Sequence, residues 1–218
     1  MNQDILKNWK NNLKEIESDV TDLLENRFVF EKVTSLIKSN PEINKDNILW
    51  DYLKLNYGSA MVLGIARQVD TKRSSVALLR ILGEIKKSHQ VITEKWFAKQ
   101  YVNTVMGSDF GAKEFKENFG REGFLDEKIV DDDIKSFKNQ TVDILNFRHT
   151  RIAHKNKDKT LAFDLPFSKV NSALDLLEKI VIKYNLLLNQ VGIEKLLPVM
   201  TYDWEEVFRV PWEIKIHD

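Results

Sequence analysis

Two arginines and two histidines lie within seven consecutive positions, and they form the densest group of residues in the chain that could do chemistry. They are Arg148, His149, Arg151 and His154. Arginine carries a permanent positive charge and a planar set of donors that suits phosphate oxygens. Histidine can gain or lose a proton near neutral pH. The combination provides a proton shuttle and a cationic clamp, and it therefore favours cleavage of a phosphodiester without a metal.

A short basic segment overlaps and follows this group. Between Arg148 and Lys159 the sequence holds five Lys or Arg and one Asp, a local net charge of +4 before any histidine is protonated. The whole chain, in contrast, has a formal net charge of zero. A neutral protein does not coat nucleic acid broadly, so any contact with nucleic acid is expected to be local.

The composition is typical of an intracellular globular protein. The chain has 218 residues, enough to bury a sizeable core without covalent staples. It has no cysteine, which excludes a disulfide framework and a thiolate metal site. Its first residues lack the basic and apolar regions of a secretion signal, and charges interrupt every apolar stretch before about 18 residues. We therefore expect a cytoplasmic protein that does not enter a membrane.

The elements that must position the motif are predicted to be helical almost throughout. Glycine and proline are scarce, with 8 and 4 copies, and most windows follow the period of an amphipathic helix. The predicted helices cover residues 3–25, 28–38, 46–69, 74–87, 93–101, 112–119, 130–153 and 167–190. The sequence therefore predicts an all-α fold, an elongated bundle of long helices. Residues 1–190 are expected to form one helical domain, with residues 191–218 as a C-terminal extension packed on it.

Local signals mark the two helices that flank the motif. Asp131, Asp132 and Asp133 suit the positive end of a helix dipole, so the helix before the motif is predicted to begin near Val130. Pro166 suits the first turn of the helix that follows the motif. The three aspartates could also bind Mg²⁺, but consecutive helical residues point in different directions, so we favour the helix start.

A patch of small residues around Ala60 and Gly64 predicts the close approach of a second helix. Small side chains allow two helix backbones to lie near each other, either within one bundle or across a dimer. The contact within the bundle is favoured.

The position of Arg148 on its helix is unusual. An apolar stripe runs along Val130, Ile134, Phe137, Thr141, Leu145 and Ile152. At about 100° per residue, Arg148 falls near the middle of that stripe. A guanidinium there needs a partner, because an unpaired buried charge is costly. Either a carboxylate of another helix pairs with Arg148, or the stripe opens onto a cleft in which Arg148 faces a phosphate.

His154 follows Arg148 by six residues, which on a straight α-helix places the two side chains about 120° apart. They would then not converge on one phosphate. Either the helix ends or bends before His154, or a second copy of the chain completes the site. The polar run 155–159 favours an end to the helix.

The pattern Arg148-His149-x4-His154 resembles the signature of the HEPN superfamily of helical proteins, an arginine and a polar residue followed by a histidine a few positions later. The segment Arg-Ile-Ala-His at 151–154 is similar to the abortive-infection branch of that superfamily, and the segment 66–79 is similar to it more loosely. The resemblance extends over residues 1–190, but only the motif itself is specific.

The resemblance implies a helical bundle that forms a homodimer, with two motifs facing one cleft. It also implies a metal-independent endoribonuclease, often the toxin of a toxin–antitoxin system or a phage-defence effector. The 2′-hydroxyl of RNA would attack the adjacent phosphorus. His154 would act as general base or acid, and Arg148 would stabilise charge on the phosphorane oxygens.

Neighbouring residues would support these two catalytic side chains. His149 would orient a reacting group, and Arg151 would help to hold flanking phosphates. The residues that would bind RNA phosphates beside it are Lys155, Lys157 and Lys159. An antitoxin or another regulatory protein would be a further partner.

Neither a metal nor a cofactor is predicted. His149 and His154 are five positions apart, not the four of a helical zinc pair, and no adjacent glutamate completes such a motif. The sequence departs from the family at Asn156, where many toxins of this kind carry a tyrosine that can be modified. Silencing by modification at this position is therefore not expected.

Two other hypotheses remain open from the sequence. A catalytically silent helical module would bind RNA or a cognate protein through the same basic segment. A purely structural dimer predicts that Arg148 is buried in an ion pair within one chain.

Overall fold

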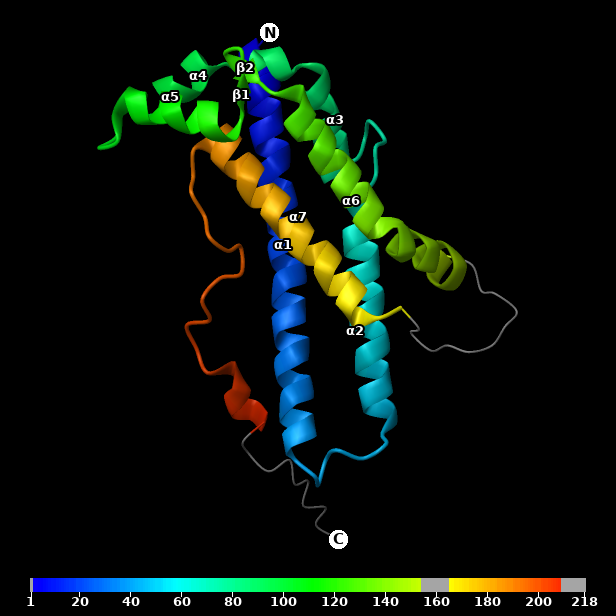
Figure 1. The fold of residues 1–218 in the computed structure, drawn as a ribbon. Coiled ribbons are helices and arrows are strands. Elements are labelled where there is room, and N and C mark those ends of the chain that lie inside the picture. Colours follow the sequence, from blue (N-terminus) through cyan, green and yellow to red (C-terminus); the bar gives the residue numbers. More distant parts are fainter. Residues whose placement is uncertain (1, 154–164, 209–218) are drawn as a thin grey trace.

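Helix α1 (Asn2–Ser39) runs along almost the whole length of the molecule (Figure 1). The computed structural model describes residues 2–153 and 165–208, and it describes side chains from 3 to 150 and from 165 to 208. The sequence predicts two helices in place of α1, and this prediction is wrong. Neither Asn26 nor Arg27 interrupts the helical backbone, and Arg27 forms an ion pair with Asp175. That pair connects the predicted break to α7, the helix that follows the motif.

Helix α2 (Ile48–Arg67) returns beside α1 and forms a helical hairpin with it (Figure 1). The side chain of Asn47 caps its first turn. A Cβ atom added to Gly64 would lie 2.5 Å from a methyl carbon of Leu23 on α1. The small residue at position 64 therefore serves helix packing within one chain, and the helix predicted at 46–69 is confirmed.

The buried side chain of Gln68 forms hydrogen bonds that hold the connection between α2 and α3 (Leu78–Lys87) against α1. Its carbonyl oxygen accepts a hydrogen bond from the Leu78 amide at 3.1 Å, and its nitrogen donates to Asp19 of α1 at 3.0 Å. The Asp70 carboxylate accepts hydrogen bonds from the loop that follows it, so the helix begins at Leu78 and not at residue 74. The segment 66–79 is thus a structural connection.

The segment between α3 and α6 forms a small lobe at one end of the bundle (Figure 1). Its elements are η1 (His89–Val91), α4 (Glu94–Lys99), α5 (Gly107–Asn118), β1 (Gly120–Arg121) and β2 (Phe124–Leu125). The strands are antiparallel, with Gly120 opposite Leu125. The two helices are predicted from the sequence, although α5 begins at Gly107 and not at residue 112. The hairpin is not predicted, because strands of two residues are too short to show an alternating pattern.

Helix α6 (Glu127–Phe147) carries the motif at its C-terminal end. It begins at Glu127 and not at the predicted Val130. The cause is Asp126, whose side chain accepts a hydrogen bond from the Lys128 amide at 2.9 Å and so caps the helix.

The aspartates at 131 and 133 therefore lie in the second turn of α6, where they join helices together. The Asp131 carboxylate accepts a hydrogen bond from Lys86 of α3 at 2.7 Å. The Asp133 carboxylate accepts one from Lys183 of α7, also at 2.7 Å. The prediction that the three aspartates mark the helix start is wrong, because α6 begins at Glu127 with Asp126 as its cap, and Asp131 and Asp133 bind lysines of neighbouring helices.

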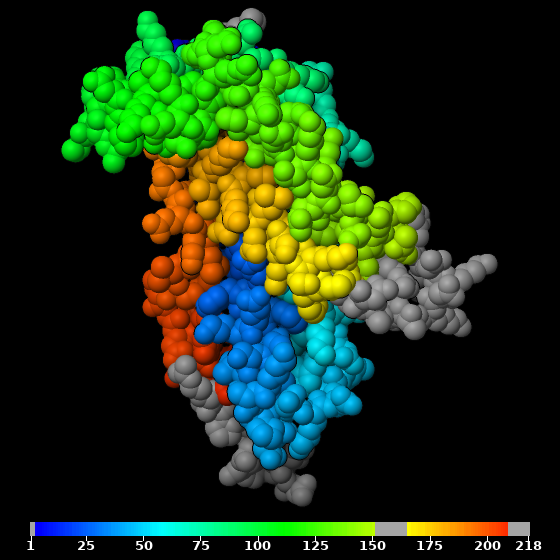
Figure 2. All heavy atoms as spheres, in the orientation of Figure 1, coloured from blue at the N-terminus to red at the C-terminus, as the bar shows by residue number. Residues whose placement is uncertain are grey.

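Helix α7 (Phe167–Asn189) begins directly after Pro166, as predicted. After it, residues 190–208 run along α1 and α7 and end in η3 (Trp204–Phe208) (Figures 1 and 2). The Leu196 amide donates to Glu178 of α7 at 2.9 Å, and the Trp204 ring meets Phe28 of α1 edge-on. These contacts hold the described part of the C-terminal segment against the bundle. Residues 209–218 lie outside the described part of the chain.

The hydrophobic core lies where α1, α3, α6 and α7 meet. Its largest fully buried side chains include Trp9, Phe137 and Tyr184, which come from three of these helices. The all-α fold is confirmed, with one short hairpin as the sheet structure of the described residues. None of the described helices is long and apolar enough to span a membrane.

Candidate functional site

The α-helical backbone of α6 ends at Phe147, and the six residues Arg148–Ala153 continue it as a π-helical turn, η2. The sequence predicts an α-helix as far as residue 153. This prediction is wrong for the last six residues, which are π-helical and not α-helical. Single π-helical turns are rare and occur frequently at functional sites. Here the turn coincides with the beginning of the arginine–histidine motif.

Local hydrogen bonds accompany the change of backbone at this point. The Thr150 hydroxyl donates to the carbonyl oxygen of Asn146 at 2.9 Å, a bond of the kind that bends helices. The backbone amide of Arg148 still bonds to the carbonyls of Ile144 and Leu145, so the α-helical ladder reaches this residue. Phe147 is partly buried against the core and anchors the start of the turn.

Arg148 is exposed to solvent, and the part of the chain that the structure describes offers its guanidinium no carboxylate partner. Four residues earlier Ile144 is fully buried, and so is Thr141, whose hydroxyl bonds back to the Phe137 carbonyl at 2.8 Å. Arg148 therefore lies on the same side of α6 as these buried residues, as the helical period of about 100° per residue predicts. Arg148 itself lies past the end of the core, which contradicts the expectation of a buried ion pair among the described residues.

His149 and Thr150 are also exposed on the same turn. The turn contacts α2 as well as α6, so two helices support its backbone. A side chain that is exposed on a well-supported turn is accessible to a large polar ligand such as RNA.

The remaining residues of the predicted site fall beyond what the structure describes. Arg151 is placed by its backbone within the π-helical turn, but its side chain lies outside the described part. His154 and the predicted RNA-binding residues are outside the described residues entirely; the latter are Lys155, Lys157 and Lys159. The angle of about 120° predicted between Arg148 and His154 assumes a straight α-helix, and the α-helix ends at Phe147. The position of His154 relative to Arg148 lies outside the described residues.

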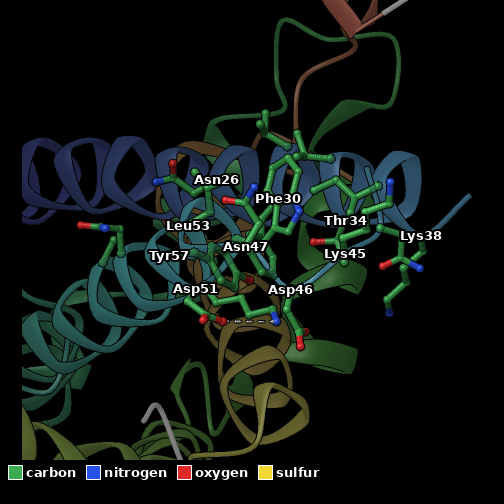
Figure 3. A pocket seen from close by; sticks show the side chains of 18 residues that line it. Asn26, Phe30, Thr34, Lys38, Lys45, Asp46, Asn47, Asp51, Leu53 and Tyr57 are labelled. Carbon is green, nitrogen blue, oxygen red and sulfur yellow. Dashed lines mark ion pairs between the residues drawn. The ribbon is translucent and has the colours of Figure 1, made fainter. Parts of the chain in front are cut away.

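A groove of about 530 Å³ lies between α1 and α2, away from the motif (Figure 3). Phe30 and Tyr57 stack within it, with ring centroids 3.9 Å apart. Burial, and then the charge of Glu31, raises the pKa of the Tyr57 hydroxyl to about 12. Asp51 and Lys54 form an ion pair on its rim, at 3.9 Å. The groove does not contain the arginine–histidine motif.

The sequence analysis does not predict this groove, although a signal for it exists. Val29, Val33 and Ile37 recur every four residues on α1 and line the groove opposite α2. All three lie within the helix predicted over 28–38, but the sequence alone does not show that α2 packs opposite them. The groove offers aromatic and aliphatic contact area but no cluster of residues for catalysis. Among the described residues, no group of three or more His, Cys, Asp or Glu side chains could hold a metal ion.

Comparison with known proteins identifies a family. A family model described as HEPN AbiU2 matches residues 6–208 of the chain, from the second turn of α1 to the end of η3, and the match includes the complete motif. No curated protein sequence and no solved structure matches.

Proposed function

The chain belongs to the HEPN AbiU2 family, a family of the abortive-infection type, and on this premise we propose that it is a metal-independent endoribonuclease. The π-helical turn that begins at Arg148 would be its catalytic centre. The coarse assignment rests on the family, and the reaction and the residues are proposed from the motif and its surroundings.

The observation that carries the proposal is the state of Arg148. The guanidinium is exposed and has no carboxylate among the described residues. It lies on a rare backbone turn that two helices support. A permanent cation that is not used to hold the fold together is available for an anionic ligand. A phosphodiester of RNA has the charge and the oxygen geometry that a guanidinium binds.

The proposed reaction is an internal transfer within the RNA chain. The 2′ oxygen attacks the adjacent phosphorus, the bond from phosphorus to the 5′ oxygen breaks, and a 2′,3′-cyclic phosphate and a 5′-hydroxyl result. A histidine takes the proton of the 2′-hydroxyl, and a protonated histidine supplies the proton that the departing 5′ oxygen needs. We assign this exchange to His154. Arg148 stabilises the negative charge that develops on the phosphoryl oxygens.

A homodimer would provide two such motifs at one cleft. Acid and base could then come from different chains, since one histidine cannot donate and accept at the same moment. His149 and Arg151 would orient the RNA, and the lysines at 155, 157 and 159 would bind its flanking phosphates.

The experiment that tests the proposal is incubation of the purified chain with total cellular RNA in excess EDTA. We expect discrete products that end in 2′,3′-cyclic phosphates, and none from the His154→Ala variant. RNA that binds tightly without being cleaved would contradict the nuclease and would favour a silent binding module.

A further inference from the structure

A polar cleft of about 600 Å³ lies between the first half of α1 and the C-terminal end of α7. Helix α6 begins at this end of the bundle, beside the small lobe, and carries the arginine–histidine motif at its other end (Figure 1). Asn185 lines the cleft and follows Phe167, the first residue of α7, by about 27 Å along the helix. The cleft is therefore separate from the candidate catalytic turn, and its volume is in the range of clefts that bind small molecules.

The polar side chain of Asn185 organises the cleft, although it is only 3% exposed. Its nitrogen donates a hydrogen bond to the Glu17 carboxylate of α1 at 2.7 Å, and its oxygen accepts one from the Asn189 amide, also at 2.7 Å. A buried amide normally has such partners, because leaving its polar atoms unpaired is costly. The two bonds hold Glu17 and Asn189 in place beside the cleft.

Two lysines of α1, Lys10 and Lys14, line the same cleft one helical turn apart. Like charges at this spacing repel each other. Among the described residues, neither ammonium group has a carboxylate at ion-pair distance. Lys10 lies over the Trp96 ring of α4, 5.5 Å from its centroid, and burial lowers the pKa of its ammonium group. An anion bound between the two lysines would offset both their repulsion and the partial burial of Lys10.

Lys14 and Glu17 have a spacing that allows them to pair, because residues three apart on a helix have Cβ atoms about 5–6 Å apart. In the described part of the chain these two residues form no ion pair, and Glu17 is held by Asn185 instead. A positive and a negative group therefore lie next to each other in the cleft without neutralising each other. This arrangement is complementary to a small molecule that carries both charges on neighbouring atoms.

We propose that this cleft binds a free α-amino acid with an aliphatic side chain. The carboxylate of the amino acid lies between Lys10 and Lys14, and its ammonium group donates to Glu17. A simple anion fits the cleft less well, because it meets the negative charge of Glu17. A simple amine fits less well because it meets two lysines.

The C-terminal end of α7 and the segment after it complete the proposed site. The side-chain oxygen of Asn189 is a second acceptor for the ammonium group, since the bond to Asn185 uses only the nitrogen of Asn189. Val191 and Ile193 line the cleft beside it. Ile193 packs against the core and Val191 is 47% exposed, so the two provide an apolar surface for an aliphatic side chain.

Isothermal titration of the full chain with leucine tests the proposal, and two analogues of leucine test its two charges. The keto acid α-ketoisocaproate keeps the carboxylate but lacks the ammonium group, and isoamylamine keeps the ammonium group but lacks the carboxylate. We expect saturable binding of leucine and binding of each analogue that is about tenfold weaker or more, because each analogue meets a like charge and loses one partner. The absence of leucine binding at about 10 mM, or equal binding of the keto acid, would overturn the proposal.

Two variants locate the site within the chain. Lys14→Gln should weaken the binding of leucine and of the keto acid alike, by about tenfold or more, and its unfolding curve should match the wild type because Lys14 is exposed. Glu17→Gln keeps an acceptor for Asn185 but removes the negative charge. It should therefore weaken the binding of leucine and strengthen that of the keto acid.

The matched control is Lys99→Gln, which replaces an exposed lysine of α4 outside the cleft and should bind leucine as the wild type does. Unchanged leucine binding by both cleft variants would mean that leucine binds elsewhere and would overturn the site.

The amino-acid site and the nuclease can fail separately, because the cleft contains no residue of the arginine–histidine motif. RNA cleavage without leucine binding would contradict only the amino-acid site. Leucine binding without RNA cleavage would support the cleft and contradict only the proposed reaction.

Discussion

At the scale of single residues, Arg148 shows what a periodic pattern can and cannot predict. The angular argument places it on the apolar face of α6, and Ile144, four residues before it, is indeed buried. Arg148 is nevertheless exposed, because the α-helix ends at Phe147 and the core ends with it. A periodic pattern gives the direction of a side chain around a helix axis. It does not say how far along the axis the neighbouring helices extend.

Gln68 gives the opposite case, a polar side chain that is fully buried at the end of a helix. The replacement Gln68→Ala should lower the free energy of unfolding by about 1–3 kcal/mol, because the buried Leu78 amide and the Asp19 carboxylate both lose a partner. Urea unfolding measures this change. The exposed Gln100→Ala serves as the control and should stay within about 0.5 kcal/mol of the wild type. Equal stability of the two variants would contradict a structural role for Gln68.

No feature of the sequence distinguishes Gln68 from an exposed glutamine. Its burial depends on Asp19 and Leu78, which are 49 and 10 positions away along the chain. Contacts of this kind follow from the arrangement of helices, and single-sequence periodicity does not contain that arrangement.

At the scale of elements, the positions of most helices are predictable and their ends are not. The ends depend on single capping bonds, such as the one from the Lys128 amide to Asp126 at the start of α6. The π-helical turn follows the last residue of α6 and leaves the apolar period of the preceding residues intact. The sequence analysis also fails to predict that α1 is continuous. The polar residues at 26–27 suggest a break between two helices, but the backbone is helical there.

The link between α3 and α6 predicts a pH dependence. Hydrogen bonds from Lys135 and then Lys86 lower the pKa of Asp131 to about 2. A carboxylate whose pKa is depressed on folding stabilises the fold above its unfolded pKa of about 4, and this stabilisation is lost as the pH falls toward 2. Asp131→Asn should therefore be less stable than the wild type near neutral pH, with the difference shrinking in acid.

Urea unfolding of both proteins at several pH values measures this difference. Asp132→Asn is the matched control, since the neighbouring Asp132 is exposed. A difference between wild type and Asp131→Asn that stays constant from neutral pH to about pH 2.5 would contradict the contribution of this ion pair.

At the scale of the whole molecule, the long hairpin of α1 and α2 extends beyond the end of α7 (Figure 1). This extension leaves the groove around Phe30 and Tyr57 open. The sequence predicts the fold class and the motif, but the relative reach of the helices becomes visible only in the structure. The candidate catalytic turn contacts α2, which belongs to this hairpin.

The central claim is that Arg148 acts on RNA and does not serve the fold. The most direct test is the rate of RNA cleavage in EDTA by Arg148→Ala and by Arg121→Ala. Arg121 is an exposed arginine of β1, before the start of α6 and so about 30 Å from the motif. We expect Arg148→Ala to lower the cleavage rate about 10²–10³-fold with an unchanged unfolding curve, and Arg121→Ala to match the wild type. Cleavage by Arg148→Ala at the wild-type rate, or its loss only through unfolding, would contradict the claim.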